Sequence, residues 1–215
     1  MNWLNQLERK LYRLRVQPFI RYILLAMTGV YVLDTLFPTA NLYYRLSLLM
    51  PLVYRGEVWR LLTFLILPPA GSMLTTLLHI YFYYFIGTTL EQRWGTRRFL
   101  LYYVLGAVGA ILAAVITGMG TNYYLYMSMF FATAIMNPEA EILLFFVLPI
   151  KMKWLALLNA AYFLYSFIVS AWSARLALLF SILNVLLFFG GDMLNLIRNS
   201  LNQWRRRRTF RNSSR

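Results

Sequence analysis

The sequence predicts an all-α integral membrane protein, built as a bundle of six transmembrane helices with both termini in the cytoplasm. Apolar residues make up 60% of the 215 residues and charged residues only 13%, whereas a soluble domain carries about a quarter charged residues. Six predominantly apolar stretches fill most of the chain, and the basic residues gather on one side of them. These three observations exclude an ordinary soluble globular protein.

The six apolar stretches are expected to be helices, because none shows the alternation of apolar and polar residues that is typical of barrel strands. A helix needs about 20 residues to cross a typical hydrocarbon core, and about 17 at the short end. Several of the stretches are therefore short for a full crossing. They cover residues 22–37, 72–90, 99–117, 123–136, 154–172 and 174–192.

Basic segments flank the predicted membrane domain, which covers residues 22–192. In residues 1–21, apolar side chains such as Trp3 fall on one helical face and basic side chains on the others, which is typical of a helix lying on the cytoplasmic membrane surface. A merely solvated, charged terminus is the alternative. Residues 193–215 are expected to form a basic cytoplasmic tail.

The orientation is predicted from the 21 basic residues. With six spans and an inner N-terminus, all but four of them lie on the cytoplasmic side, the exceptions being Arg45, Arg55, Arg60 and Arg175. Cytoplasmic loops carry such an excess of Lys and Arg. The net charge of +14 then predicts binding of the basic termini to anionic lipid headgroups, at about 1 kcal/mol per basic residue. Nucleic-acid binding is not expected, because the basic tail is short and has no fold attached.

Two connections are too long and too apolar to be simple loops. Residues 38–70 hold four prolines with leucine-rich pieces between them, and we expect short helices that lie in the outer membrane interface. In residues 137–154, Pro138 and Pro149 flank an apolar run. That run is too short to span a bilayer, so we expect a partly embedded inner loop.

Small residues recur every four positions along the third apolar stretch, at Gly106, Ala110, Ala114 and Gly118. A helix face made of small residues lets the backbone of a neighbouring helix approach closely. We therefore expect this helix to lie at the centre of the bundle, with its small-residue face packed inside the chain and not against a second copy.

Three short motifs lie at the ends of the predicted helices. They are Trp59-Arg60 in the first loop, Glu91-x-Arg93-Trp94-Gly95 after the second stretch, and Gly190-Gly191 in the sixth. Together they resemble the rhomboid superfamily, over about residues 56–192. The Glu-x-Arg-Trp-Gly motif after an apolar span is fairly specific, whereas Trp-Arg alone is weak. The resemblance implies a rhomboid-like six-helix bundle with cytoplasmic termini.

The motif residues are expected to support the scaffold. Glu91 lies at a helix end, where its carboxylate can accept hydrogen bonds from the backbone of a neighbouring loop, and Gly95 permits the turn into the next helix. Trp59 and Arg60 have amphipathic side chains of the kind that anchor a loop at headgroup depth. A direct part in chemistry is not expected for any of the four.

The resemblance also implies four catalytic positions, and all four depart from the protease pattern. Active rhomboid proteases pair a serine, in a Gly-x-Ser-Gly motif of the fourth span, with a histidine in the sixth, while further donors hold the oxyanion. Counted from the neighbouring motifs, the dyad positions hold Tyr123 and Phe188, and the oxyanion positions hold Thr75 and His79. Proteolysis is therefore not expected, and no catalytic residue is assigned.

The remaining candidates for chemistry are weak. Ser128 has no small neighbours, and its hydroxyl is expected to bond to the carbonyl one turn earlier. The single histidine, His79, is expected to be a neutral imidazole bonded to Tyr83, Tyr84 or Asn122. A proton- or client-sensing role for His79 is the alternative. The seven carboxylates are scattered along the chain, so neither a metal ion nor a cofactor is expected.

Because the chain resembles rhomboids but lacks their catalytic dyad, the resemblance implies the role of the non-proteolytic members of the superfamily, which are the derlins and the inactive rhomboids. These bind membrane-protein clients at a lateral opening beside the second and fifth helices. We therefore expect a protein that binds transmembrane segments and influences their stability, assembly or disposal, with short helices that thin the bilayer. The candidate client gate consists of aromatic residues on those two helices: Tyr81, Tyr84, Phe85, Tyr162, Phe163 and Tyr165.

Two alternative functions stay open. The first is an enzyme, either a divergent intramembrane serine protease with a relocated active site or an activity unrelated to proteolysis. The second is a small transporter, which would be expected to show matched halves with broken helices, and this sequence shows no such repeat. Under each reading the chain is expected to be a multi-pass protein, and we expect it in a bacterial cytoplasmic membrane.

Overall fold

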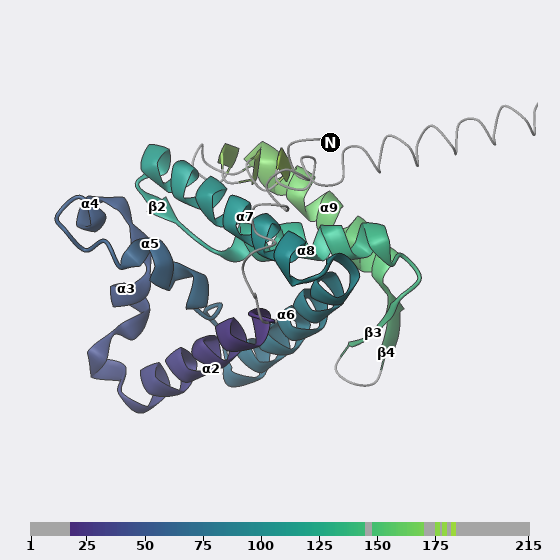
Figure 1. Ribbon diagram of the computed structural model, residues 1–215, viewed down its shortest axis with the longest axis horizontal. Helices are drawn as coiled ribbons and strands as arrows, with labels where there is room; N and C mark the ends of the chain where they lie inside the picture. Colours follow the sequence, from purple (N-terminus) through teal and green to yellow (C-terminus); the bar gives the residue numbers. More distant parts are fainter. Residues whose placement is uncertain (1–17, 145–147, 170–174, 177, 180–181, 184–215) are drawn as a thin grey trace, which may run out of the picture.

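The computed structural model describes residues 18–144 and 148–169, and three short pieces at 175–176, 178–179 and 182–183. The described chain is mostly helical (Figure 1). Several predicted features lie outside the described residues. These are the surface helix up to residue 17, the dyad position Phe188, the pair Gly190 and Gly191, and the tail 193–215.

Helices form in the first five apolar stretches, and short elements form in the connections between them, whereas most of the sixth stretch lies outside the described residues. The helices are α2 (Ile20–Leu36), α3 (Leu42–Leu46), α4 (Met50–Val53), α5 (Arg60–Thr63), α6 (Met73–Trp94), α7 (Thr96–Thr117), α8 (Tyr123–Met136) and α9 (Met152–Val169), with 3-10 turns η1 (Pro38–Ala40) and η2 (Phe64–Ile66). Two antiparallel pairs join β1 (Leu48–Leu49) to β2 (Met119–Gly120) and β3 (Glu141–Leu144) to β4 (Leu148–Lys151).

Within the described residues, α7 and α9 are long and apolar enough to cross a membrane. A third candidate is α2 joined to the segment Pro38–Leu46, which follows it after a bend of 106°. Helix α8 is apolar but shorter than these. The prediction of a mostly helical protein is confirmed, and two or three of the described helices have the length and apolar character that a membrane crossing needs. The number of six spans stays a prediction.

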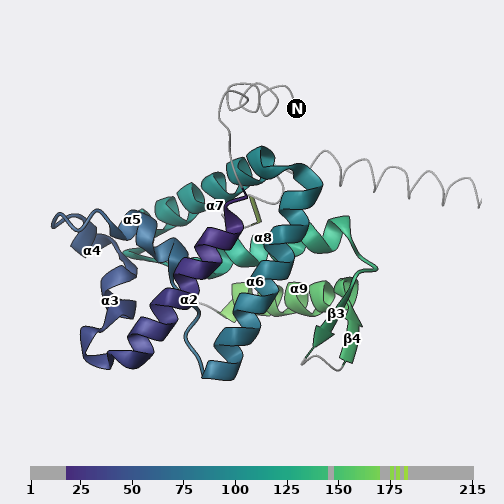
Figure 2. The same cartoon turned by 60° about the horizontal axis from the view of Figure 1, so that its bottom comes forward.

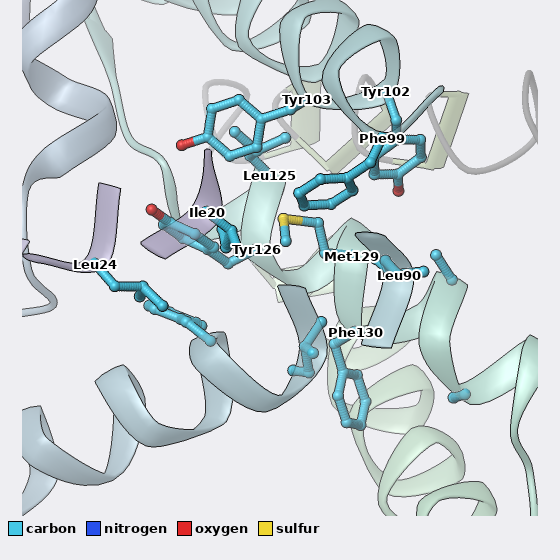
Figure 3. Packing of buried hydrophobic residues seen from close by; sticks show 14 of the residues in the cluster. Ile20, Leu24, Leu90, Phe99, Tyr102, Tyr103, Leu125, Tyr126, Met129 and Phe130 are labelled. Carbon is cyan, nitrogen blue, oxygen red and sulfur yellow. The ribbon is translucent and has the colours of Figure 1, made fainter. Parts of the chain in front are cut away.

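Helix α6 packs against α2, α7 and α8 (Figures 1 and 2). The side chains buried between these helices include Leu90, Phe99 and Met129 (Figure 3). Tyr83 of α6 stacks on Tyr126 of α8, with ring centroids 3.9 Å apart. Because the helices are apolar over much of their circumference, one continuous core forms where three of them meet α6.

The small-residue face of α7 is present in part. Gly106 and Ala114 are buried, as expected. Gly118 instead ends the helix in the left-handed conformation, at φ 85°, where its amide bonds to the Ala114 carbonyl. The expectation that α7 is the central helix is wrong for the described residues, because α6 contacts more of the long helices and α7 exposes Val108 and Leu112.

The connection from α2 to α6, which we call the outer lobe (residues 37–70), folds into short helices at one end of the molecule (Figure 2). This agrees with the short helices expected there. In the lobe, Leu48 pairs with Gly120 and Leu49 with Met119 of the α7–α8 connection. A Cβ at Gly120 would lie 2.6 Å from Leu48 Cδ2, so glycine is required where these two strands meet.

The connection from α8 to α9 is a β-hairpin at the opposite end of the molecule (Figure 2). A partly embedded inner loop that does not span was expected there. The structure adds that this connection is a regular hairpin, and its depth in a membrane stays a prediction. Ile142 of β3 pairs with Ile150 of β4, and Leu143 pairs with Pro149. Proline is tolerated because both strands of a two-stranded sheet have an open edge, where the missing N–H removes no ladder bond. Prolines therefore excluded a helix here without excluding strands.

Candidate functional site

Glu91 fastens the start of α2 to the end of α6. Its side chain is buried, and its Oε1 accepts a hydrogen bond of 3.2 Å from the backbone amide of Phe19, the residue before α2. Amides at a helix N-terminus have no partner within the helix, so the carboxylate supplies one. The predicted role of Glu91 as an acceptor for backbone of a neighbouring segment is confirmed.

The rest of the Glu-x-Arg-Trp-Gly motif holds two further helices at the same place. Arg93 Nη2 donates to the side-chain oxygen of Asn137, the residue that ends α8. The Trp94 ring packs edge-on against Tyr102 of α7, with ring centroids 5.3 Å apart. Gly95 turns the chain from α6 into α7 at φ 77°, which confirms the predicted permissive turn. The motif thus sets the positions of α2, α7 and α8 relative to α6.

Arg60 organises the outer lobe from the inside. Its guanidinium is 2% exposed, and Nε donates to Glu57 Oε2 at 2.7 Å. Its Nη1 donates to the carbonyls of Tyr44 at 2.5 Å and Ser47 at 2.8 Å. Trp59 is 52% exposed. Anchoring at headgroup depth was expected of both residues. It stays a prediction for the exposed Trp59 and is wrong for Arg60, whose buried guanidinium crosslinks the loop.

Of the degenerate catalytic positions, Tyr123 lies on α8, whereas Thr75 and His79 lie one turn apart on α6. Tyr123 is the first residue of α8 and is partly buried. Thr75 lies in the first turn of α6, and its hydroxyl donates to the Ser72 carbonyl at 2.8 Å. His79 lies one turn further along α6. Phe188, the second dyad position, lies outside the described residues.

Ser128 is held as a structural hydroxyl. Its side chain is fully buried, and Oγ donates to the Leu125 carbonyl at 2.7 Å, which confirms the expected bond to the preceding turn. A serine nucleophile needs a base that takes its proton, and a backbone carbonyl cannot do so. Nor, within the part of the chain that the structure describes, do three metal-ligating side chains come together.

The His79 ring bonds to its own helix. Nδ1 lies 2.7 Å from the Thr75 carbonyl oxygen, and the ring centroid lies 6.1 Å from that of Tyr83. The expected bond to Tyr83, Tyr84 or Asn122 is therefore wrong, because a carbonyl one turn back lies within reach. A carbonyl oxygen can only accept, so the hydrogen is assigned to Nδ1, and Nε2 is the acceptor of the neutral ring.

Helix α6 lines two different hollows with two different faces. The α6 residues in a cavity of about 200 Å³ shared with α8 and α9 are His79, Phe82, Tyr83 and Ile86. The α6 residues in an open groove of about 680 Å³ shared with α2 are Leu77, Ile80, Tyr81 and Tyr84. Both sets have the i, i+3, i+4, i+7 spacing of one helix face, and the two faces point away from each other.

The predicted gate residues on α6 face α2 or the core. Tyr81 and Tyr84 line the groove between α2 and α6, which we call the α2–α6 groove. Phe85 packs against the main core. The aromatic residues that α6 turns toward α8 and α9 are instead Phe82 and Tyr83. The gate expected between the second and fifth helices is therefore not formed by the α6 residues named for it.

The predicted gate residues on α9 also divide. Phe163 is buried, and its ring packs against Phe131 of α8 with centroids 5.4 Å apart. Tyr162 and Tyr165 are exposed within the described part of the molecule. Aromatic character alone did not separate them, because a helix turns successive residues by 100°, so neighbours in sequence face different surroundings.

Asn122, the residue before α8, and Tyr126 of α8 were not predicted as a pair, and both bond to the end of the outer lobe. Asn122 Nδ2 donates to the Leu67 carbonyl at 2.8 Å, and the Tyr126 hydroxyl donates to the Leu65 carbonyl at 2.9 Å. The proline pair that follows Leu67 was the sequence feature that could have predicted these bonds. Prolines have no N–H, so carbonyls near them must find donors on other elements.

Comparisons with known proteins leave the family open. No protein-family model matches the chain, and no curated protein matches it significantly. Membership of the rhomboid superfamily therefore stays a prediction that depends on the motifs around Trp59-Arg60 and Glu91-x-Arg93-Trp94-Gly95. The geometry adds that each of these motifs makes structural contacts between elements.

Proposed function

We propose that the chain is a non-proteolytic, rhomboid-like membrane protein that binds transmembrane segments of client proteins and influences their stability, assembly or disposal. The observation that carries the proposal is the α2–α6 groove, an open hollow of about 680 Å³ with an almost wholly apolar lining. Helix α6 forms one wall of the groove and α2 forms the other. Helix α2 is the first part of the bent pair of helices that is one of the candidate membrane spans. This supports the inference that the groove opens to the hydrocarbon region in which clients would lie.

A helix suits this groove better than lipid chains do. Lipid is as apolar as a leucine side chain, so helices associate in a bilayer through close packing and through polar groups. On the α2 side the groove is lined in part by the small residues Thr28 and Gly29. A Cβ at Gly29 would have nothing within 4 Å, so there is room for an approaching helix. Tyr81 and Tyr84 form the opposite wall, with rings for packing and hydroxyls for hydrogen bonds.

The contacts of the polar residues favour binding over chemistry. Ser128 is buried and bonded to a backbone carbonyl, and the His79 Nδ1 bonds to the carbonyl of Thr75. These two side chains would have to meet for the alternative function, a protease with a relocated site. Client binding needs no such pair.

A defined probe tests the groove. The full chain is reconstituted in vesicles with a photoreactive group in place of the Tyr84 side chain, together with a synthetic alanine–leucine helix of about 20 residues that carries small residues along one face. We expect crosslinking from position 84. Gly29→Leu should lower the yield several-fold, because a Cβ at this position meets nothing within 4 Å and the leucine side chain would extend into the space that the helix needs.

The matched control uses α7. Val108 is exposed on that helix and lies outside the groove, so a photoreactive group there measures random encounters, and Val108→Leu should leave the yield from position 84 unchanged. A yield at Tyr84 no higher than at Val108, or an unchanged yield in Gly29→Leu, would contradict the proposal. Stronger capture from Tyr162 than from Tyr84 would also contradict the groove as the binding place.

A serine-directed fluorophosphonate probe separates this proposal from the protease alternative. The purified protein in detergent should not react with the probe, because the Ser128 hydroxyl is buried and has a carbonyl as its partner. Ser128→Ala is the control for any signal. If the wild-type protein is labelled and Ser128→Ala is not, the binding proposal is wrong and the protease alternative is supported.

The proposal includes the setting of the protein. Helices α7 and α9 are long and apolar enough to cross a bilayer, which supports an integral membrane protein. We infer a multi-pass protein of a bacterial cytoplasmic membrane, with its basic termini against anionic headgroups on the inner side. Protease accessibility of the two termini in inverted and right-side-out vesicles tests this orientation.

A further inference from the structure

The outer lobe contains a hollow of about 710 Å³ that the proposed client binding does not use. Short elements line it, from the turn after α2 to the start of α5. Its polar and aromatic lining residues are Asn41, Tyr44, Arg45, Glu57, Trp59 and Arg60. Apolar side chains, Leu42 and Leu46 among them, complete the wall. A hollow with this lining can accept a molecule that is partly charged and partly apolar.

The charge of the hollow comes from one side chain. Arg60 is buried and forms an ion pair of 2.7 Å with Glu57, so these two charges cancel. Arg45 is exposed and forms no ion pair within the described residues. Asp34 accepts a bond from the Tyr43 amide, but it does not line the hollow. The hollow therefore carries a net positive charge, and an anion is the charge it can attract.

The surroundings of the hollow fit the membrane interface. Trp59 and Tyr44 line it and are exposed, and such amphipathic rings gather at the level of the lipid headgroups. The bonds from Arg60 to the Tyr44 and Ser47 carbonyls hold this wall in place. An arginine beside exposed interfacial aromatics can meet a lipid phosphate while the apolar lining receives part of an acyl chain.

The geometry points to a binding site for the phosphate headgroup of an anionic membrane lipid in the outer lobe, with Arg45 as the residue that binds the phosphate. A dissolved phosphate ion is the less suitable occupant, because a single exposed arginine competes poorly with water for it. A lipid adds the burial of apolar surface against Leu42 and Leu46. This site shares no lining residue with the α2–α6 groove.

A photoreactive phosphatidylglycerol tests the site in the full-length protein in detergent. Adducts are mapped to the outer lobe by peptide mass spectrometry, so that binding at the basic termini is counted separately. Arg45→Gln should raise the half-saturating lipid concentration for lobe adducts about fivefold, which corresponds to the loss of about 1 kcal/mol. Arg45→Lys should keep most of the affinity, because the positive charge remains.

Arg55→Gln is the matched control. Arg55 is an exposed arginine of the same lobe, but it does not line the hollow, so its removal should leave the lobe adducts unchanged. Equal losses in Arg45→Gln and Arg55→Gln, or no loss in Arg45→Gln, would overturn the site. Displacement of the lipid by millimolar inorganic phosphate would show that the occupant is the free ion and would overturn the lipid assignment.

A second measurement keeps Arg45 in place. A photoreactive group at Leu42, in the wall of the hollow, should capture phosphatidylglycerol in preference to phosphatidylcholine from mixed vesicles. Equal capture of the two lipids would contradict recognition of net negative charge. Because Arg45→Gln does not touch the α2–α6 groove, peptide crosslinking from Tyr84 should stay unchanged, and each proposal can fail without the other.

Discussion

The Glu91 carboxylate and the Arg93 guanidinium, two residues apart on α6, bind the ends of two different helices. Glu91 accepts a bond from the Phe19 amide before α2, and Arg93 donates to Asn137 at the end of α8. Gly95 then turns the chain into α7. One short segment therefore sets where three helices meet α6, and the apolar faces that pack between them depend on it (Figure 3).

Replacing Glu91 should loosen α2. Glu91→Ala leaves the Phe19 amide without its acceptor, and we expect a loss of about 2 kcal/mol in the free energy of unfolding, as for hydrogen bonds to charged groups. Glu91→Gln keeps an acceptor oxygen for the Phe19 amide, so its loss in the free energy of unfolding should be smaller. Denaturant titration of the purified protein in detergent measures both. Equal losses in the two variants would show that the bond to Phe19 contributes little.

Gly87 permits the contact between α6 and α2. A Cβ at this position would lie 2.9 Å from Ile20 Cδ1, and Ile20 is fully buried. We expect Gly87→Ala to lower the free energy of unfolding by about 1–3 kcal/mol through overpacking. In an Ile20→Ala background, Gly87→Ala should lower the free energy of unfolding by less, because the Ile20 side chain no longer occupies the space that the new Cβ needs. A double-mutant cycle by denaturant titration measures this coupling.

Gly29→Ala is the matched control for Gly87→Ala. Both glycines lie in helices, but a Cβ at Gly29 has nothing within 4 Å. Gly29→Ala should therefore be neutral or should stabilise the helix by up to about 1 kcal/mol. Additive effects of Gly87→Ala and Ile20→Ala, or an equal loss in Gly29→Ala, would contradict the contact described here.

Removing Arg60 should unfold the outer lobe. Arg60→Ala takes away the donors of the Tyr44 and Ser47 carbonyls and the partner of Glu57, and a loss of about 3 kcal/mol is expected for a buried charged group with several bonds. Arg60→Lys should retain only part of this stability, because an ammonium group cannot reproduce the planar set of N–H donors of a guanidinium. Limited proteolysis between α2 and α6 reports the opening.

The exposed Arg55 again provides the comparison for Arg60. Arg55→Ala removes an equal charge from the same lobe without removing a buried bond, so the change in free energy should stay within about 0.5 kcal/mol. If Arg55→Ala and Arg60→Ala gave the same rate of proteolysis in the lobe, the buried network around Arg60 would not be what holds the lobe together.

The charged base of the β-hairpin gives a prediction for pH. Lys153 and Lys151 donate to Glu139 at 2.5 Å and 2.9 Å, and these bonds lower the pKa of the Glu139 carboxyl from 4.5 to about 2. A lowered carboxyl pKa contributes stability above the ordinary pKa and loses it as the pH falls through the lowered value. The contact should therefore persist at pH 3 to 4, where a free glutamate is largely protonated.

The titration of Glu139 can be followed by carbon NMR of its carboxyl group in the labelled full-length protein. The midpoint should lie near 2 in the wild type. It should return toward the ordinary value of 4.5 when Lys151→Gln and Lys153→Gln are combined. A wild-type midpoint at the ordinary value would contradict the ion pairs at the base of the hairpin.

Local chemistry was sufficient to predict several features of the site. Gly95 takes a positive φ because the chain must turn between two helices, and Glu91 finds a backbone amide because it ends an apolar helix beside another chain segment. The Ser128 hydroxyl bonds to its own helix. Each of these depends on residues close in sequence or on a single buried polar group, so the pattern alone carried the information.

By itself the sequence determined that the described chain is mostly helical and that its first five apolar stretches form helices. The spacing of Tyr81 and Tyr84 is that of one face of α6. The tertiary structure decided that this face meets α2, that Phe163 is buried under α8, and that the inner connection is a hairpin. The physical reason is periodicity: the 3.6-residue repeat fixes which side chains lie together on a helix, but the neighbour on each face is set by packing among segments far apart in the chain.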